Sequence, residues 1–148
     1  MGREVGIDGA ILNEWIDTPP PPSYEQQRRM VDEERDRRIA GGVNFAGKRF
    51  QTRPFDSENI SGASTLALGA IAMGAAPGDL RWADPDHDFV WIAEDNSQVP
   101  MDALTMFGFG KTLLAHRKAL IFAGSALKDR IASGESVDIA DDANWPPA

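Results

Sequence analysis

The chain has 148 residues, of which 42% are apolar and 26% charged, values typical of a single globular domain. It contains no cysteine, which excludes disulfides, thiolate metal sites and cysteine nucleophiles. The net charge of −8 argues against nucleic-acid binding, and the longest weakly charged run is too rich in Gly, Ala and Ser for a membrane span. We therefore expect neither a nucleic-acid partner nor membrane insertion.

Residues 1–22 are predicted to form an extended arm that ends in four consecutive prolines. Such a run favours a stiff polyproline II spacer. Before it lie three glycines that break regular structure, and four large apolar side chains: Ile11, Leu12, Trp15 and Ile16. Either this segment is a disordered leader, or it docks these side chains onto a partner chain. We favour docking, because a free arm would expose a tryptophan and three aliphatic side chains to water.

A first helix is predicted from about Tyr24 to Ala40. Ser23 can cap it, Gln26 completes a capping box, and two glycines end it. Acidic residues precede arginines by four positions in the favourable order: Glu25–Arg29, Glu33–Arg37 and Glu34–Arg38. Apolar residues are few, so this helix should pack by a narrow stripe.

Residues 43–45 and 49–52 alternate as two strands of a hairpin, and Pro54 is expected to stop the second strand. A second helix is predicted from Ser57 to Met73, with Asp56 or Ser57 as its cap. One face of this helix carries small residues, which should let it lie close to a sheet.

Leu80–Trp82 and Phe89–Ile92 are predicted to pair as a second hairpin, with a short third strand around Gln98–Val99. Trp82 and Trp91 could offer a platform for stacking a sugar. Aromatic side chains in strands are more often core or interface residues, and we favour packing.

A long third helix is predicted from Met101 or Asp102 to Ala132. Its wide apolar face consists of two neighbouring lines: Met106, Leu113, Leu120 and Leu127 in one, and Phe107, Leu114 and Ile121 in the other. The acidic residues 135–148 are predicted to form a loose tail.

Three patterns that could carry chemistry each lack a required feature. Gly108–Thr112 resembles a phosphate-binding loop, but Thr105 occupies the position of the first glycine. The acidic turn 84–88 lacks the glycine and glutamate of a calcium loop. His116 has no obvious nucleophile to activate. We therefore expect no catalytic residue, metal or cofactor, and no enzymatic activity.

Three segments occur in an order that resembles a phage and prophage domain family of unknown function, found in tail-fibre and tail-fibre-assembly proteins. The segments are residues 35–52, Gly78-Asp79-Leu80-Arg81-Trp82, and 91–103. The resemblance covers roughly Arg28 to Ile131 and carries over no catalytic residue.

We therefore expect an α+β fold in which three helices pack on two antiparallel β-hairpins that form a small sheet. The predicted units are the arm (1–22), the folded domain (23–134) and the acidic tail (135–148). The resemblance implies a structural component of a phage tail, at the distal tail, baseplate or fibre, with the arm tethering it to another tail or fibre protein. We expect a homo-oligomer, a trimer or a ring, located in the virion and in the host cytoplasm during assembly. The alternatives are a tail-fibre assembly chaperone and a receptor- or glycan-binding module that uses Trp82 and Trp91.

Overall fold

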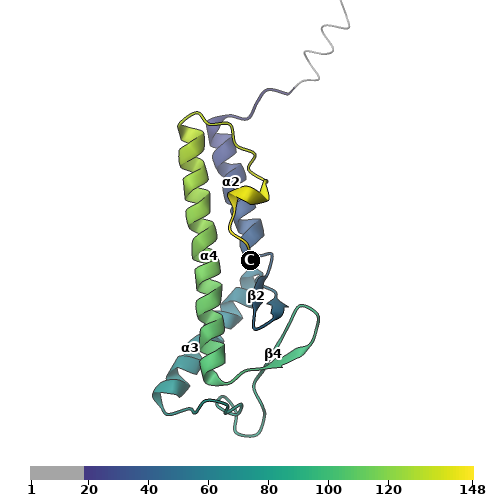
Figure 1. The fold of residues 1–148 in the computed structure, drawn as a ribbon, viewed down its shortest axis with the longest axis vertical. Coiled ribbons are helices and arrows are strands. Elements are labelled where there is room, and N and C mark those ends of the chain that lie inside the picture. Colours follow the sequence, from purple (N-terminus) through teal and green to yellow (C-terminus); the bar gives the residue numbers. More distant parts are fainter. Residues whose placement is uncertain (1–18) are drawn as a thin grey trace, which may run out of the picture.

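The computed structural model describes residues 19–148, which form three α-helices, two β-hairpins and one short 3-10 helix (Figure 1). In chain order these are α2 (Tyr24–Ile39), β2 (Val43–Phe45), β3 (Lys48–Phe50), α3 (Pro54–Ala72), β4 (Val90–Ile92), β5 (Gln98–Pro100), α4 (Ala103–Ala132) and η1 (Asp142–Asn144). The α+β fold class predicted from the sequence is confirmed. Across these described residues, no helix has the length and apolar content that crossing a membrane requires.

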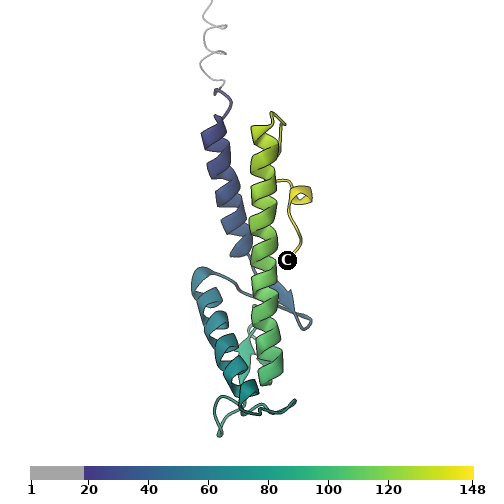
Figure 2. The ribbon, with the colours of Figure 1, turned by 90° about the vertical axis from the view of Figure 1, so that its left-hand side faces the viewer.

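Helix α4 is the axis of the molecule, because α2 and α3 both pack along it. Its 30 residues span about 45 Å. Figure 2 shows α3 beside the N-terminal half of α4 and α2 beside the C-terminal half. The buried positions of α4 recur every three or four residues: Ala103, Met106, Phe109, Leu113, His116, Leu120, Gly124, Leu127 and Ile131. The first of the two predicted lines faces the core, whereas Leu114 and Ile121 of the second line are exposed, so the buried face is narrower than predicted.

Two clusters of buried side chains lie one after the other along α4. The larger cluster joins α3, the hairpins and the first half of α4, with the rings of Phe50 and Phe109 4.7 Å apart. The smaller cluster joins α2, the second half of α4 and the C-terminal segment through Val31, Leu120 and Trp145.

Helix α2 begins at the predicted capping box, in which Gln26 N donates to Ser23 Oγ (3.1 Å) and Ser23 N donates to Gln26 Oε1 (2.7 Å). The predicted pair Glu34–Arg38 forms, at 2.6 Å. Arg37 also donates to Glu34, and these hydrogen bonds lower the pKa of the Glu34 carboxyl. Val31 is the buried residue of this helix, as expected for a narrow packing stripe.

The small residues of α3 face α4 and not a sheet, which corrects the predicted partner of this face. Ile60 and Ala67 are fully buried there. The helix also begins earlier than predicted, at Pro54, because the fixed φ of proline suits a first helical turn. Asp56 accepts a hydrogen bond from Arg53 N at 3.1 Å, so it satisfies a backbone group at this helix start.

The first hairpin is confirmed, with Ala46 and Gly47 at positive φ (52° and 76°) in a two-residue turn between β2 and β3. The second predicted hairpin has the wrong strands, because β4 pairs with β5 and Leu80–Trp82 forms no strand. The hairpins remain two separate sheets, linked by Glu94 N donating to Arg49 O at 2.8 Å.

Residues 135–148 pack against the helices, so the prediction of a loose tail is wrong. The Trp145 ring is buried, and its Nε1 donates to Ile139 O at 2.8 Å. Arg38 of α2 donates to Asp142 (2.7 Å) and lies 5.4 Å from the centroid of the Trp145 ring. The prediction was based on the acidic composition of the segment and did not take into account its two apolar anchors, Ile139 and Trp145, which are buried.

Candidate assembly surfaces

One face of α3 and its C-cap is exposed to solvent and uncharged. We call this face the α3 stripe; its members recur at alternating spacings of four and three residues: Phe55, Asn59, Gly62, Leu66, Gly69 and Met73. The exposed fractions of Phe55, Leu66 and Met73 are 72%, 58% and 91%. Alternating spacings of four and three are those of a seam between packed helices.

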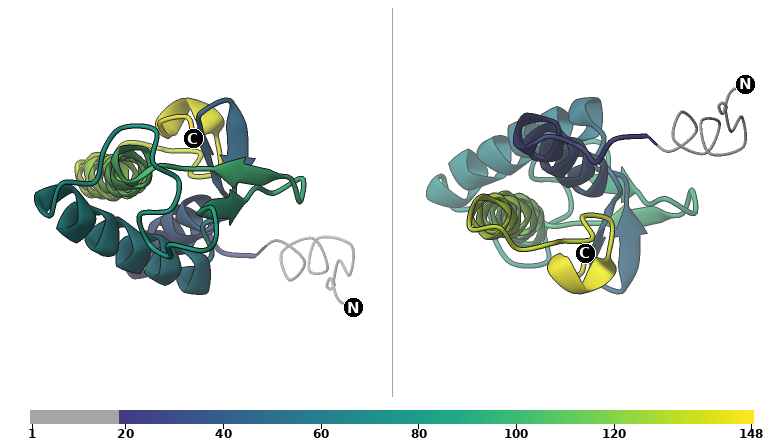
Figure 3. Two further views of the ribbon diagram at one scale, coloured as in Figure 1. Left: turned by 90° about the horizontal axis from the view of Figure 1, so that it is seen from below. Right: turned by 90° about the horizontal axis from the view of Figure 1, so that it is seen from above.

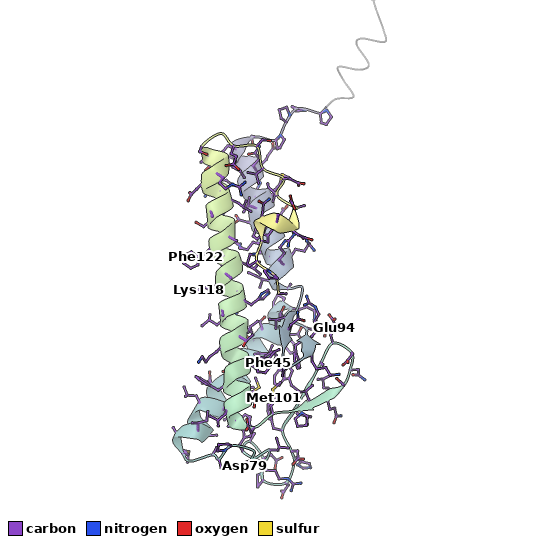
Figure 4. The ribbon with its side chains drawn as sticks, viewed as in Figure 1. Phe45, Asp79, Glu94, Met101, Lys118 and Phe122 are labelled. Carbon is purple, nitrogen blue, oxygen red and sulfur yellow. The ribbon has the colours of Figure 1, made fainter. Side chains whose placement is uncertain are left out.

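The outward face of α4 combines apolar and basic side chains. We call this face the α4 stripe: Leu104, Phe107, Lys111, Leu114, Lys118, Ile121 and Phe122. Leu114, Ile121 and Phe122 are 66%, 49% and 64% exposed. Figure 4 shows Lys118 and Phe122 on the side of α4 that faces away from α2.

Each lysine of the α4 stripe lies over an aromatic ring. Lys111 Nζ is 5.7 Å from the ring centroid of Phe107, and Lys118 Nζ is 5.8 Å from that of Phe122. Such contacts hold the ammonium groups over the apolar stripe and leave them open to a negatively charged partner.

These two stripes were not predicted as surfaces. The sequence places Leu114 and Ile121 on one wide apolar face with Leu113 and Leu120, but the structure buries only the second pair. For α3, the sequence feature that could have predicted the stripe is the spacing between Phe55, Leu66 and Met73, which fits a heptad pattern. Glycines at two of the intervening heptad positions make this pattern hard to recognise.

Trp82 and Trp91, the predicted stacking residues, are half-buried and belong to a chain of aromatic contacts. The ring centroids of Trp82 and Phe89 are 4.6 Å apart, and those of Trp91 and Phe109 are 6.1 Å apart. Trp82 Nε1 donates to Met101 O at 2.9 Å. The two rings therefore pack within the domain, and ligand stacking by them stays a prediction.

The predicted anchors of the arm, Ile11, Leu12, Trp15 and Ile16, lie outside the described residues. Their docking onto a partner stays a prediction as well.

His116 lines a pocket of about 520 Å³ between the end of α2, β3 and the C-terminal segment, together with Arg38 and Arg49. The imidazole is 8% exposed, and burial lowers its pKa from 6.5, which favours the neutral form. Its Nε2 has no hydrogen-bond partner within the described part of the chain. Arg38 pairs with Glu34 and Asp142, so the guanidinium at the rim of this pocket already has carboxylate partners within the domain.

A different acidic turn, between β4 and β5, is held by hydrogen bonds and an ion pair. Asp95 accepts hydrogen bonds from Ser97 Oγ and Ser97 N (2.5 and 3.0 Å) and pairs with Lys48 of β3 at 3.0 Å. The Ser97 hydroxyl, the Ser97 amide and the Lys48 ammonium all stabilise the carboxylate, so the pKa of Asp95 lies well below its usual range. This turn ties one hairpin to the other.

A family model for a domain of unknown function matches residues 23–144. The match is longer than the resemblance seen in the sequence, since it includes the capping box at Ser23 and reaches η1. Neither the curated proteins nor the solved structures contain a match to this chain. The chain belongs to the family of the domain of unknown function DUF4376.

Proposed function

We propose that this protein is a non-enzymatic structural component of a phage tail, at the distal tail, baseplate or fibre, and that it acts through protein–protein assembly. The observation that carries the proposal is the α3 stripe, in which Phe55, Leu66 and Met73 are all more than half exposed. A monomeric protein seldom leaves such a row of large apolar side chains in water.

The α3 stripe is suited to a second copy of the same chain. The chain has a net charge of −8, so two copies repel each other over most of their surfaces, whereas this face carries no charge. Gly62 and Gly69 leave room for close approach, since a Cβ built on either would have no atom within 4 Å. Two copies that pair through the same face form a symmetric dimer, and copies that contact each other head to tail can close into a ring. Either arrangement has the closed symmetry expected of a tail component.

The arm supplies the second contact of the proposed component. Ile11, Leu12, Trp15 and Ile16 would bind another tail or fibre protein, because large aromatic and aliphatic anchors commonly dominate such interfaces. The placement in a phage tail is supported by the resemblance of residues 35–52, 78–82 and 91–103 to tail-fibre and tail-fibre-assembly proteins. The protein would then be found in the virion, and in the host cytoplasm before assembly is complete.

Mass spectrometry of purified phage particles that encode the chain tests the proposal. A fixed stoichiometry relative to the major tail protein is the expected result. A protein that is needed for fibre formation but is missing from the mature particle would instead be an assembly chaperone. Loss of the gene with normal particles and normal fibres would overturn both functions.

Light scattering of the isolated full chain tests the surface that carries the proposal. Leu66→Glu places a charge in the middle of the α3 stripe and should raise the Kd for self-association by about tenfold or more. Leu68→Glu is the matched control, since Leu68 lies on α3 outside the stripe and is similarly exposed (49% against 58%). Equal effects of the two substitutions would contradict the assignment of this face.

A further inference from the structure

We propose that the α4 stripe is the binding site for the N-terminal arm of a second copy of this chain, and we call this binding site the seat. This inference deepens the proposed function, since it rests on the arm acting as a tether there and identifies the tail protein that receives the arm as a further copy of this chain. Three features of the chain support it: the charge of the two segments, the direction in which the proline spacer leaves the domain, and the length of the arm.

The α4 stripe lies on the basic part of an acidic protein. Between Ala103 and Lys128 the helix contains Lys111, Arg117, Lys118 and Lys128 and no acidic residue, in a chain of net charge −8. Lys128 pairs with Asp32 of α2 at 2.5 Å. Within residues 19–148, Lys111 and Lys118 have no carboxylate partner, and their contacts are the rings of Phe107 and Phe122. This surface therefore suits a segment that is both apolar and acidic.

The arm has that composition. Residues 1–18 contain four acidic side chains against one basic: Glu4, Asp8, Glu14 and Asp17 against Arg3. The apolar anchors lie between these acids, since Ile11 and Leu12 follow Asp8, and Trp15 and Ile16 stand between Glu14 and Asp17. Apolar contacts would supply the affinity, and the carboxylates facing Lys111 and Lys118 would select this face over the uncharged α3 stripe.

The direction of the proline spacer favours a neighbouring copy over the same copy. Figure 3, seen from above, shows residues 19–23 leaving the start of α2 on the side away from α4. Gln27 Nε2 donates to Pro22 O at 3.4 Å, which holds the last proline against the first turns of α2. A stiff spacer pointing away from its own α4 stripe presents the arm to another molecule.

The arm is long enough to cover the α4 stripe. Eighteen residues reach at most about 60 Å when extended, whereas the whole of α4 is about 45 Å long. An arm that leaves one copy and binds a different face of the next makes a head-to-tail contact. Such contacts close into rings when the rotation between copies allows.

A charge exchange between two full-length variants tests this inference. One variant carries Lys111→Glu and Lys118→Glu, which makes the seat acidic; the other carries Glu14→Lys and Asp17→Lys, which makes the arm basic. Each variant alone should self-associate about tenfold more weakly than the unmodified chain, because like charges then face each other. An equimolar mixture should recover the association, since each arm in it finds a seat of opposite charge.

Two controls make the result specific. Arg28→Glu with Arg29→Glu makes the same change in net charge as Lys111→Glu with Lys118→Glu, but on the exposed surface of α2, and it should leave association within about twofold. Circular dichroism checks that every variant is folded. If the mixture does not recover association while both variants are folded, the α4 stripe does not receive the arm.

Cross-linking identifies which copy provides the arm. A photoreactive benzoylphenylalanine at position 122, in a mixture of isotope-labelled and unlabelled chains, should capture peptides of residues 1–18 from the other isotope. Capture of same-isotope peptides alone would show that the arm folds back on its own domain and would overturn the inference. Absence of any arm peptide would overturn it too.

The outcomes for the inference and for the proposed function are separable. Stoichiometric presence in phage particles without cross-links between arm and α4 would remove the inference and leave the tail component. Cross-links between copies of a protein that is missing from the particles would remove the tail component and leave the arm exchange.

Discussion

Gly110 of α4 lies directly against Ser64 of α3. A Cβ built on Gly110 would stand 2.1 Å from Ser64 Oγ and 2.4 Å from Ser64 Cβ, far inside van der Waals contact. The absence of a side chain at position 110 therefore sets how closely the two helices approach. This contact also explains a glycine in the interior of a long helix, where glycine is unfavourable.

Gly110→Ala should destabilise the domain, because the new methyl group must push α3 away from α4. Overpacking of this kind costs about 1–3 kcal/mol, which exceeds the gain of about 1 kcal/mol from replacing glycine in a helix. The free energy of unfolding in urea measures the net loss. Ser64→Gly in the same chain should recover part of it by removing the atoms that clash.

Gly108→Ala is the control on the same helix. The nearest atom to a Cβ at position 108 is Phe45 Cζ at 4.0 Å, so a methyl group fits. This substitution should raise the free energy of unfolding by about 0.5–1 kcal/mol. A loss of stability equal to that of Gly110→Ala would show that the spacing of the two helices does not depend on Gly110.

Trp145→Ala should lower the free energy of unfolding by about 3–5 kcal/mol, the usual cost of truncating a buried aromatic side chain. The ring fills the space beside Gly124, with two ring carbons 3.7 Å from a Cβ built there, and Ile139 O would lose its donor. Phe122→Ala removes a comparable ring that is 64% exposed and should cost less than about 1 kcal/mol. Urea unfolding followed by circular dichroism measures both, and equal small losses would mean that the C-terminal segment adds no stability.

The parts of the fold that depend on local chemistry could be predicted from the sequence. The capping box of Ser23 and Gln26 is a signal within a few residues, and it appears where expected. Helix α4 begins within two residues of its predicted start, and Asp102, which was not predicted as a cap, accepts from Thr105 N at 2.7 Å through Oδ1. The turn at Ala46 and Gly47 is equally local. These signals fix the start of α2, the start of α4 and the first hairpin.

The structural predictions that were wrong depend on contacts between distant parts of the chain. Leu80–Trp82 has the composition of a strand, but Trp82 Nε1 donates to Met101 O, nineteen positions away, and β4 has β5 as a closer partner. In the sequence, Trp145 lies in an acidic tail, and its burial depends on contacts with Arg38 and the second half of α4, which are far away along the chain. Periodicity alone likewise does not say which of two neighbouring apolar lines on α4 is buried, because that depends on where α2 and α3 lie.

Trp82→Ala separates the packing role of this side chain from the predicted glycan stacking. The loss of the ring contact with Phe89 and of the hydrogen bond to Met101 O should lower the free energy of unfolding by about 2–4 kcal/mol. Trp82→Phe should recover most of the packing and none of the hydrogen bond. Binding of the full chain to a glycan array that is lost in both variants, while Trp82→Phe remains stable, would support the receptor-binding alternative.

His116 should make the stability depend on pH in a window that begins just above its ordinary pKa of 6.5 and extends down to its lowered pKa in the folded state. Burial lowers the pKa of His116 in the folded state, so the unfolded chain binds the proton more readily. Stability is therefore at its full value above the unfolded pKa and falls as the pH drops through 6.5 toward the folded pKa. The charged group that lowers the pKa further is Arg49 of β3, whereas a backbone contact with Arg38 opposes the shift.

Urea midpoints measured at intervals across this window, for the unmodified chain and for His116→Leu, isolate the effect. The carboxyl groups whose pKa values are lowered, such as Asp95 and Asp102, titrate well below pH 5 and contribute equally to both proteins. The unmodified chain should lose stability relative to His116→Leu as the pH falls, with the difference levelling off once the folded imidazole is protonated. Parallel curves for the two proteins would show that His116 has the same pKa in both states, in which case the C-terminal segment does not bury the imidazole in solution.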